Sequence, residues 1–184
     1  MYLTFDDGPH PTITPWVLEE LRKYNAYATF FCIGKNVEQF KETYESILDQ
    51  GHAIGNHTFN HLNGWETEDD RYLQDILDAS QLIHSNLFRP PYGKIKLKQA
   101  RRISNLFNNR IQIIMWDTLS GDFDKNYSAE QCVQNVIENV RNGSIIVFHD
   151  SEKAYPNLKQ SLPEVLGFLR KEGYKMKKIQ YQPL

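Results

Sequence analysis

Short apolar runs alternate with longer amphipathic segments along the whole chain. The apolar runs are rich in β-branched and aromatic residues, which is typical of strands covered on both faces. They predict strands near residues 2–5, 28–32, 52–55, 87–89, 111–116, 144–149 and 174–179. The segments between them carry apolar residues at helical spacing and predict helices near residues 14–24, 37–50, 69–85, 97–107, 129–141 and 158–171.

This alternation of strands and helices predicts an α/β fold with a parallel sheet and right-handed crossovers. An open doubly wound sheet and an incomplete barrel both fit the pattern. Polar residues of chemical interest follow the carboxyl ends of the predicted strands, and in a barrel those ends converge on one mouth. Scattered surface polar residues are not expected to segregate in this way.

Composition narrows the class of protein without identifying it. The 184 residues allow one domain with a sizeable core, and the formal net charge of −2 gives no electrostatic footprint for nucleic acid or an anionic membrane. No apolar run approaches membrane-spanning length, and the two cysteines, Cys32 and Cys132, are expected to be buried thiols. We expect a monomer with no nucleic-acid partner.

The first predicted strand begins at Tyr2, and we therefore expect no signal peptide in the chain as given. Two localisations follow as expectations. The chain as given is cytoplasmic, or it acts in the cell envelope or outside the cell if its N-terminus is a trimmed one.

Two adjacent carboxylates, Asp6 and Asp7, close the first predicted strand before Gly-Pro. Neighbouring carboxylates are costly unless a cation compensates them or one takes up a proton. His57 and His61 follow the third predicted strand and supply imidazoles, so that one Asp and two His could form an open zinc-type site while the other Asp acts as a base. The alternatives are a turn-capping Asp and surface or capping histidines.

Two further motifs carry candidate chemistry. Arg89 opens the rigid segment Arg-Pro-Pro-Tyr-Gly and could orient the base carboxylate, although a purely structural ion pair explains it as well. His149 ends an apolar strand and is a candidate general acid, with Asp122 or Asp150 as an acidic neighbour. The alternative for His149 is a hydrogen-bonded histidine at a strand end.

Taken together, five motifs in order resemble the polysaccharide deacetylase family, the NodB-homology or carbohydrate esterase family 4 domain. They are residues 4–9, 57–61, 89–93, 116–123 and 147–150, and residues 28–31 and 51–56 match as well. The resemblance spans nearly the whole chain. It implies a single NodB-like domain over residues 1–184, folded as a deformed, incomplete (β/α) barrel of about seven parallel strands.

The resemblance also implies a metal site and a base. Asp7, His57 and His61 would bind one divalent metal, with Zn²⁺ expected and Co²⁺ or another divalent ion as alternatives. Asp6 would be the catalytic base that takes a proton from the attacking water, and Arg89 would support it.

On the other side of the reacting group, the resemblance implies that His149 is the general acid and that Asp122 supports it. The backbone N–H of Tyr92 would stabilise the oxyanion. Phe123 and Val147 are candidate walls of a pocket sized for an acetyl methyl group. Phe123 departs from the family pattern, which often has tryptophan there.

The implied reaction is hydrolysis of N-acetyl groups from GlcNAc-containing glycans, either chitin oligosaccharide or peptidoglycan, with release of acetate. An acetyl-xylan esterase or a small-amide hydrolase on the same fold would use the same catalytic residues. A non-catalytic binding module should lack at least one of the base, the acid or a metal ligand, and all of them are present here.

Overall fold

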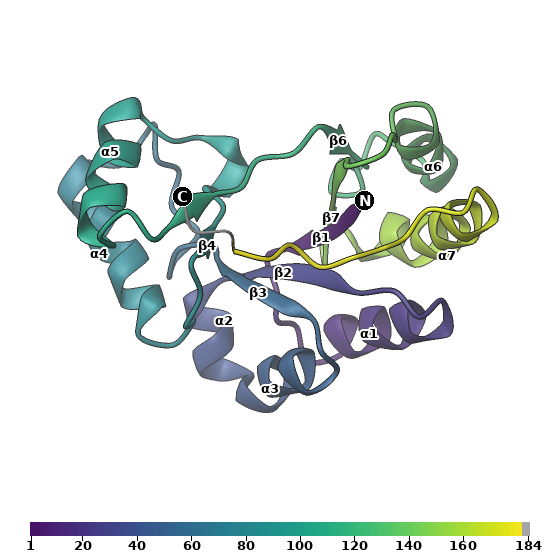
Figure 1. Ribbon diagram of the computed structural model, residues 1–184, viewed down its shortest axis with the longest axis horizontal. Coiled ribbons are helices and arrows are strands. Elements are labelled where there is room, and N and C mark those ends of the chain that lie inside the picture. The colour runs from purple at the N-terminus through teal and green to yellow at the C-terminus, as the bar shows by residue number, and fades with distance from the viewer. Residues whose placement is uncertain (182–184) are drawn as a thin grey trace.

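The computed structural model describes residues 1–181. Seven strands form one sheet in the order β5-β4-β3-β2-β1-β7-β6, with every neighbouring pair parallel. The sheet curls into an incomplete barrel (Figure 1), which confirms the predicted fold class. The strands are β1 (Tyr2–Asp6), β2 (Ala28–Cys32), β3 (Ala53–Asn56), β4 (Leu87–Phe88), β5 (Gln112–Ile113), β6 (Thr118–Leu119) and β7 (Ile145–His149).

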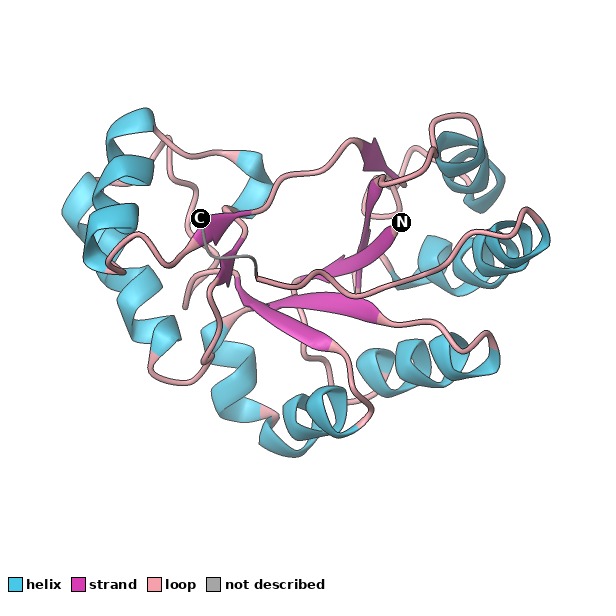
Figure 2. Ribbon diagram, in the orientation of Figure 1, coloured by secondary structure: helices cyan, strands magenta, loops and turns pink. Residues whose placement is uncertain are grey.

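Helices surround the curled sheet on its outer side (Figure 2). The helix predicted over residues 37–50 is divided in two at Phe40, and the first helix begins at Ile13, one residue before the predicted Thr14. The helices are α1 (Ile13–Lys23), α2 (Gly34–Gln39), α3 (Lys41–Asp49), α4 (Asp69–Ser80), α5 (Leu97–Leu106), α6 (Ala129–Ile137) and α7 (Tyr155–Lys171), with a short 3-10 turn, η1 (Pro91–Gly93).

Strand alternation decides which side chains face the barrel interior. Phe5 and Phe148 belong to the main apolar core, and the centroids of their rings lie 6.0 Å apart. This core also contains the buried faces of α1 and α7. Successive side chains of a strand point to opposite faces. Asp6 and His149, the next residues on β1 and β7, therefore lie on the inner face at the carboxyl end of the sheet.

The strand predicted over residues 111–116 is two separate strands. β5 lies at one edge of the sheet and β6 at the other, and the chain between them crosses the open side of the barrel (Figure 1). Because these two edges are not paired with each other in the described chain, the barrel is incomplete.

The strand predicted over residues 174–179 is absent. This segment makes one isolated parallel bridge, between Lys177 and Tyr2. β1 is already paired with β2 and β7 on its two sides, so no free strand edge is available there for a ladder. The segment instead crosses the amino ends of the strands, where Ile179 packs with Phe31 and Leu87.

The expectation of two buried thiols is confirmed within the described chain. Both cysteines are free and buried. None of the described helices has the length and apolar character that crossing a membrane requires.

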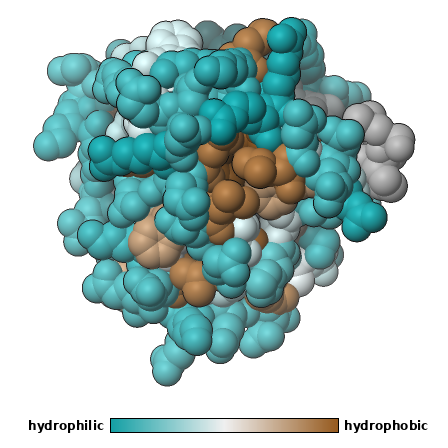
Figure 3. Space-filling view, turned by 90° about the vertical axis from the view of Figure 1, so that its left-hand side faces the viewer, coloured by the Kyte–Doolittle hydropathy of each residue, from teal (hydrophilic) through white to brown (hydrophobic). Residues whose placement is uncertain are grey.

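The face that carries α4 and α5 has apolar side chains within a largely hydrophilic surface (Figure 3). Leu97 and Leu106 of α5 are among the exposed apolar residues of the described chain. Single exposed leucines are common on globular proteins, because polar residues cannot cover the whole surface.

Candidate active site

A pocket of about 340 Å³ opens at the carboxyl ends of the strands. Eight of the ten predicted site residues line it, and the other two, Arg89 and Asp122, lie directly behind Asp6 and His149. The pocket is lined by Asp6, Asp7, His57, His61, Tyr92, Trp116, Leu119, Phe123, Val147, His149 and Lys153.

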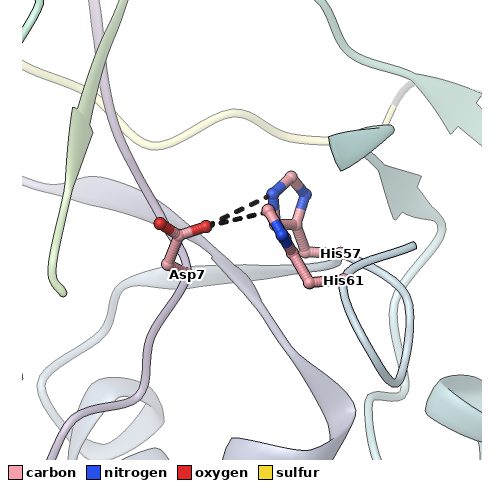
Figure 4. A group of neighbouring side chains, drawn as sticks. All are labelled: Asp7, His57 and His61. Atoms are coloured by element: carbon pink, nitrogen blue, oxygen red, sulfur yellow. Dashed lines mark ion pairs between the residues drawn. The ribbon is translucent and has the colours of Figure 1, made fainter. Parts of the chain in front are cut away.

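Asp7, His57 and His61 all line this pocket, and their side chains face one another (Figure 4). Asp7 Oδ1 lies 3.2 Å from His61 Nε2 and 3.8 Å from His57 Nε2, and one ligand atom from each residue lies within 4.8 Å of the others. Ligands about 2.0–2.1 Å from a tetrahedral zinc ion are roughly 3.3 Å apart. An oxygen and two imidazole nitrogens at these separations fit a divalent ion with an open coordination position.

His57 is prepared to be a ligand by its surroundings. Its Nδ1 lies 2.7 Å from the carbonyl oxygen of Arg89, which assigns the ring proton to Nδ1 and leaves the Nε2 lone pair facing Asp7. Burial lowers the pKa of His57 to about 4, so the ring is neutral at neutral pH. A neutral imidazole is the form that binds a metal.

The turn that carries both histidines is held by residues that the sequence motifs did not single out. Asp75, buried on α4, accepts hydrogen bonds from the backbone N–H groups of Phe59 and Asn60, each at 2.9 Å. Asn56 Oδ1 accepts from the N–H of Thr58 at 2.8 Å. These bonds stabilise a turn in which Thr58 and His61 have positive φ. No periodicity in the sequence indicated Asp75, because its role depends on how α4 packs.

Asp6 and Arg89 form a buried ion pair beside the three candidate ligands. Arg89 Nη1 donates to Asp6 Oδ1 and to Thr4 Oγ1, both at 2.7 Å, and Nε donates to the carbonyl oxygen of Ile114 at 3.1 Å. The guanidinium lies 4.1 Å above the ring centroid of Phe31. Arg89 is fully buried, so the positive charge of its guanidinium, rather than water, compensates the negative charge of Asp6.

His149 and Asp122 form the second charged pair. Asp122 Oδ1 lies 2.8 Å from His149 Nδ1, and Oδ2 accepts from the backbone N–H of His149 at 2.8 Å. Burial by itself would lower the pKa of His149, but the charge and hydrogen bond of Asp122 outweigh it and raise that pKa to about 9. The imidazole therefore carries a proton at neutral pH.

Tyr92 lies in the turn after β4 with a φ of 60°, and its ring meets that of His61 edge-on at 4.6 Å. Phe123 contacts the His149 ring edge-on at 5.0 Å. Val147 is buried at the pocket wall. The predicted walls therefore lie where an acyl group could contact them.

Three residues that were not predicted also line the pocket. Trp116 and Leu119 extend the apolar wall of the pocket, and Lys153 contributes a positive charge to it. Trp116 stands in the fourth sequence motif, so a signal for it existed. Nothing in the sequence indicated Lys153.

The comparisons with known proteins agree with this geometry. A model of the polysaccharide deacetylase family matches residues 1–110, and over 182 residues the chain is 36% identical to a peptidoglycan-N-acetylglucosamine deacetylase of Bacillus cereus. That alignment covers 94% of this chain and 83% of the relative. The chain belongs to the polysaccharide deacetylase family.

Other members of the polysaccharide deacetylase family are similar in sequence and in fold. A chitooligosaccharide deacetylase of Azorhizobium caulinodans is 34% identical, with 82% of this chain and 73% of that protein covered. A crystal structure of a peptidoglycan N-acetylglucosamine deacetylase in complex with 4-naphthalen-1-yl-N-oxidanyl-benzamide has a TM-score of 0.87 and 30% identity, covering 98% of this chain and 89% of that chain. The incomplete barrel of parallel strands is therefore shared with a solved structure of this family.

Proposed function

We propose that this protein is a metal-dependent hydrolase that removes N-acetyl groups from GlcNAc-containing glycans and releases acetate. The named relatives act on peptidoglycan or chitooligosaccharide, and both are candidate substrates. We further propose Zn²⁺ as the metal, on the basis of one carboxylate and two imidazoles, and a monomer as the active form.

The observation that carries this proposal is the arrangement around one pocket. The three candidate metal ligands line the same pocket as Asp6 and His149. Each of these two residues is paired with a buried partner of opposite charge, Asp6 with Arg89 and His149 with Asp122. Hydrolysis of an amide needs a base for the attacking water and an acid for the leaving amine. The two pairs supply these two groups.

Asp7, His57 and His61 would hold a divalent ion, which would supply Lewis acidity for the acetyl carbonyl and the attacking water. Asp6 accepts the proton of the attacking water. His149, protonated by virtue of Asp122, donates its proton to the departing amine nitrogen. The N–H of Tyr92 donates to the oxyanion of the tetrahedral intermediate.

Selection for a short acyl group follows from the walls of the pocket. Val147, Leu119 and Trp116 are apolar side chains. Contact between these walls and the acetyl methyl group is therefore more favourable than contact of either with water. We propose that these three walls accommodate a methyl group and exclude a longer acyl chain. We therefore expect acetyl amides to be preferred over butyryl amides of the same sugar.

Acetate release by metal-stripped protein, with and without added Zn²⁺ or Co²⁺, tests the proposal. The substrates are chitotetraose, peptidoglycan glycan strands, acetylated xylan and a small acetamide. Metal-dependent release from either GlcNAc glycan is expected. Release from acetylated xylan or the small acetamide alone would contradict the proposed substrate, and no release with metal demonstrably bound would contradict the proposed reaction. Light scattering of the same sample tests the monomer.

A further inference from the structure

A second hollow, of about 520 Å³, adjoins the catalytic pocket. Lys153 lines both, so the two adjoin at this side chain. The hollow runs between the loop after β6 and the start of α7. We call it the side groove; it is lined by Lys125, Tyr127, Glu152, Lys153, Pro156 and Asn157.

The side groove is held together by specific contacts. Asn157 Nδ2 on α7 donates to the backbone carbonyl oxygens of Asp122, Asp124 and Tyr127, at 3.2, 3.3 and 3.1 Å. The Tyr127 ring packs against Gly121, where an added Cβ would lie 2.6 Å from Tyr127 Cδ2. The loop that carries Phe123 into the catalytic pocket therefore also fixes the wall of the side groove.

The charge at the junction is positive. Lys153 Nζ lies 5.4 Å from the ring centroid of Phe123, and it is the single Lys or Arg among the described residues that line the catalytic pocket. Within the described residues, neither Lys153 nor Lys125 has a carboxylate within ion-pair distance. Glu152, the acidic residue of the groove, has its carboxylate 3.5 Å from His10 Nε2.

We propose that the side groove is a subsite for a carboxylate-bearing sugar next to the residue that is deacetylated. This inference rests on the proposed function. Lys153 and Lys125 would bind the carboxylate, and Tyr127, which is 42% exposed, would offer a flat ring to the sugar. The substrate class it selects is peptidoglycan rather than chitooligosaccharide, because the sugars of chitooligosaccharide carry no carboxylate.

Two sources of carboxylate exist in peptidoglycan. In a glycan without peptide it is the lactyl group of N-acetylmuramic acid. Where that group is amide-linked, the stem peptide carries the carboxylates. Both present the same chemistry to a lysine, and substrates with and without peptide separate them.

The test compares kcat/KM for acetate release from three substrates: peptide-free GlcNAc–MurNAc tetrasaccharide, its peptide-bearing form, and chitotetraose. The variant Lys153→Gln keeps the aliphatic stem but removes the charge, and Lys153→Arg restores it. The matched control is Lys159→Gln, because Lys159 Nζ lies 5.9 Å from the Tyr155 ring in a similar contact yet lines neither hollow.

We expect Lys153→Gln to lower kcat/KM about fivefold on at least one anionic glycan, mainly through KM, and to change chitotetraose less than twofold. The arginine variant should regain the preference, and Lys159→Gln should leave it intact. A loss on the peptide-free substrate assigns the lactyl carboxylate, and a loss confined to the peptide-bearing substrate assigns the stem peptide.

An equal loss on all three substrates, or no loss on any, would overturn the subsite. Absence of acetate release from every glycan by the unsubstituted protein would instead refute the proposed function. In that case glycan binding to Asp6→Asn, with and without Lys153→Gln, still decides the subsite. A salt-sensitive preference for the anionic glycan that the lysine substitution removes supports it, and equal binding of all three glycans refutes it.

Discussion

Two charged pairs lie beside the candidate metal ligands. Each pairs an aspartate with a basic side chain, but one pair is suited to act as a base and the other as an acid. Asp6 lies 2.7 Å from the guanidinium of Arg89, and Asp122 lies 2.8 Å from the imidazole of His149. Arginine keeps its charge at every pH of interest, so in the first pair the carboxylate remains the group that can accept a proton. In the second pair the carboxylate holds a proton on the imidazole. The identity of the basic partner thus decides which pair acts as base and which as acid.

The pairs also differ in how they are supported. Arg89 follows β4 and reaches Asp6 on β1, across the inner face of β2 and β3, with Phe31 beneath it. Asp122 follows β6 and meets His149 on the adjacent strand β7. Removing Arg89 should therefore affect both the stability of the fold and the catalytic reaction. Changing Asp122 should mainly affect the protonation of His149.

The largest expected effect comes from removing the base. Asp6→Asn should lower kcat by about 10²–10⁴-fold, because the amide cannot accept the proton of the attacking water. Metal content, measured by mass spectrometry on the purified variant, should stay at the level of the unsubstituted protein. A variant that turns over at a near-normal rate would remove Asp6 from the mechanism.

Breaking the first pair from its other side should destabilise the fold. Arg89→Ala leaves the buried charge of Asp6 uncompensated, and we expect the free energy of unfolding in urea to fall by about 3–5 kcal/mol. Arg102→Ala is a matched control, because Arg102 lies 2.6 Å from Asp70 in an exposed pair. The control should cost less than about 1 kcal/mol. An equal decrease in the free energy of unfolding for the two variants would contradict the expected cost of leaving the buried charge of Asp6 uncompensated.

Changing the second pair should shift a pH profile. Activity requires protonated His149, so it falls as pH rises through that pKa, which Asp122 raises to about 9. Asp122→Asn should return the pKa toward about 6.5, so the loss relative to the unsubstituted protein should be about 20-fold greater at pH 8 than near pH 6. A bound divalent cation lowers the pKa in both proteins and leaves the direction of the difference unchanged. A basic limb that stays in place would contradict the role of Asp122.

The smallest effect concerns the loop that carries Asp122. Gly121 and Gly143 both have positive φ, at 81° and 91°, but only at Gly121 does an added Cβ approach another side chain. Gly143→Ala should cost about 1–2 kcal/mol from backbone strain alone. Gly121→Ala should cost about 1–3 kcal/mol more, because the methyl group meets the Tyr127 ring. Thermal unfolding of both variants measures the difference, and equal melting temperatures would exclude that close contact.

Local patterns predicted the fold class and indicated the residues that the structure brings to one pocket. Asp6 and Asp7 close a strand, and His57 and His61 are four residues apart, so each set is placed together by covalent geometry. The length of the edge strands was not predictable in this way. Residues 111–116 read as one strand, yet the chain leaves the sheet after Ile113 and joins its other edge at Thr118.

The sequence by itself determined the order of the motifs, the side of each strand on which their polar residues lie, and hence the ten predicted residues of the candidate site. These follow from the period of two along a strand and from the polarity of parallel strands. Only the tertiary structure decided that Arg89 is fully buried against Phe31 and that residues 174–179 pass the sheet without joining it. It also decided that Lys153 reaches the catalytic pocket. Each of these depends on distant segments packing together, and no local pattern encodes that.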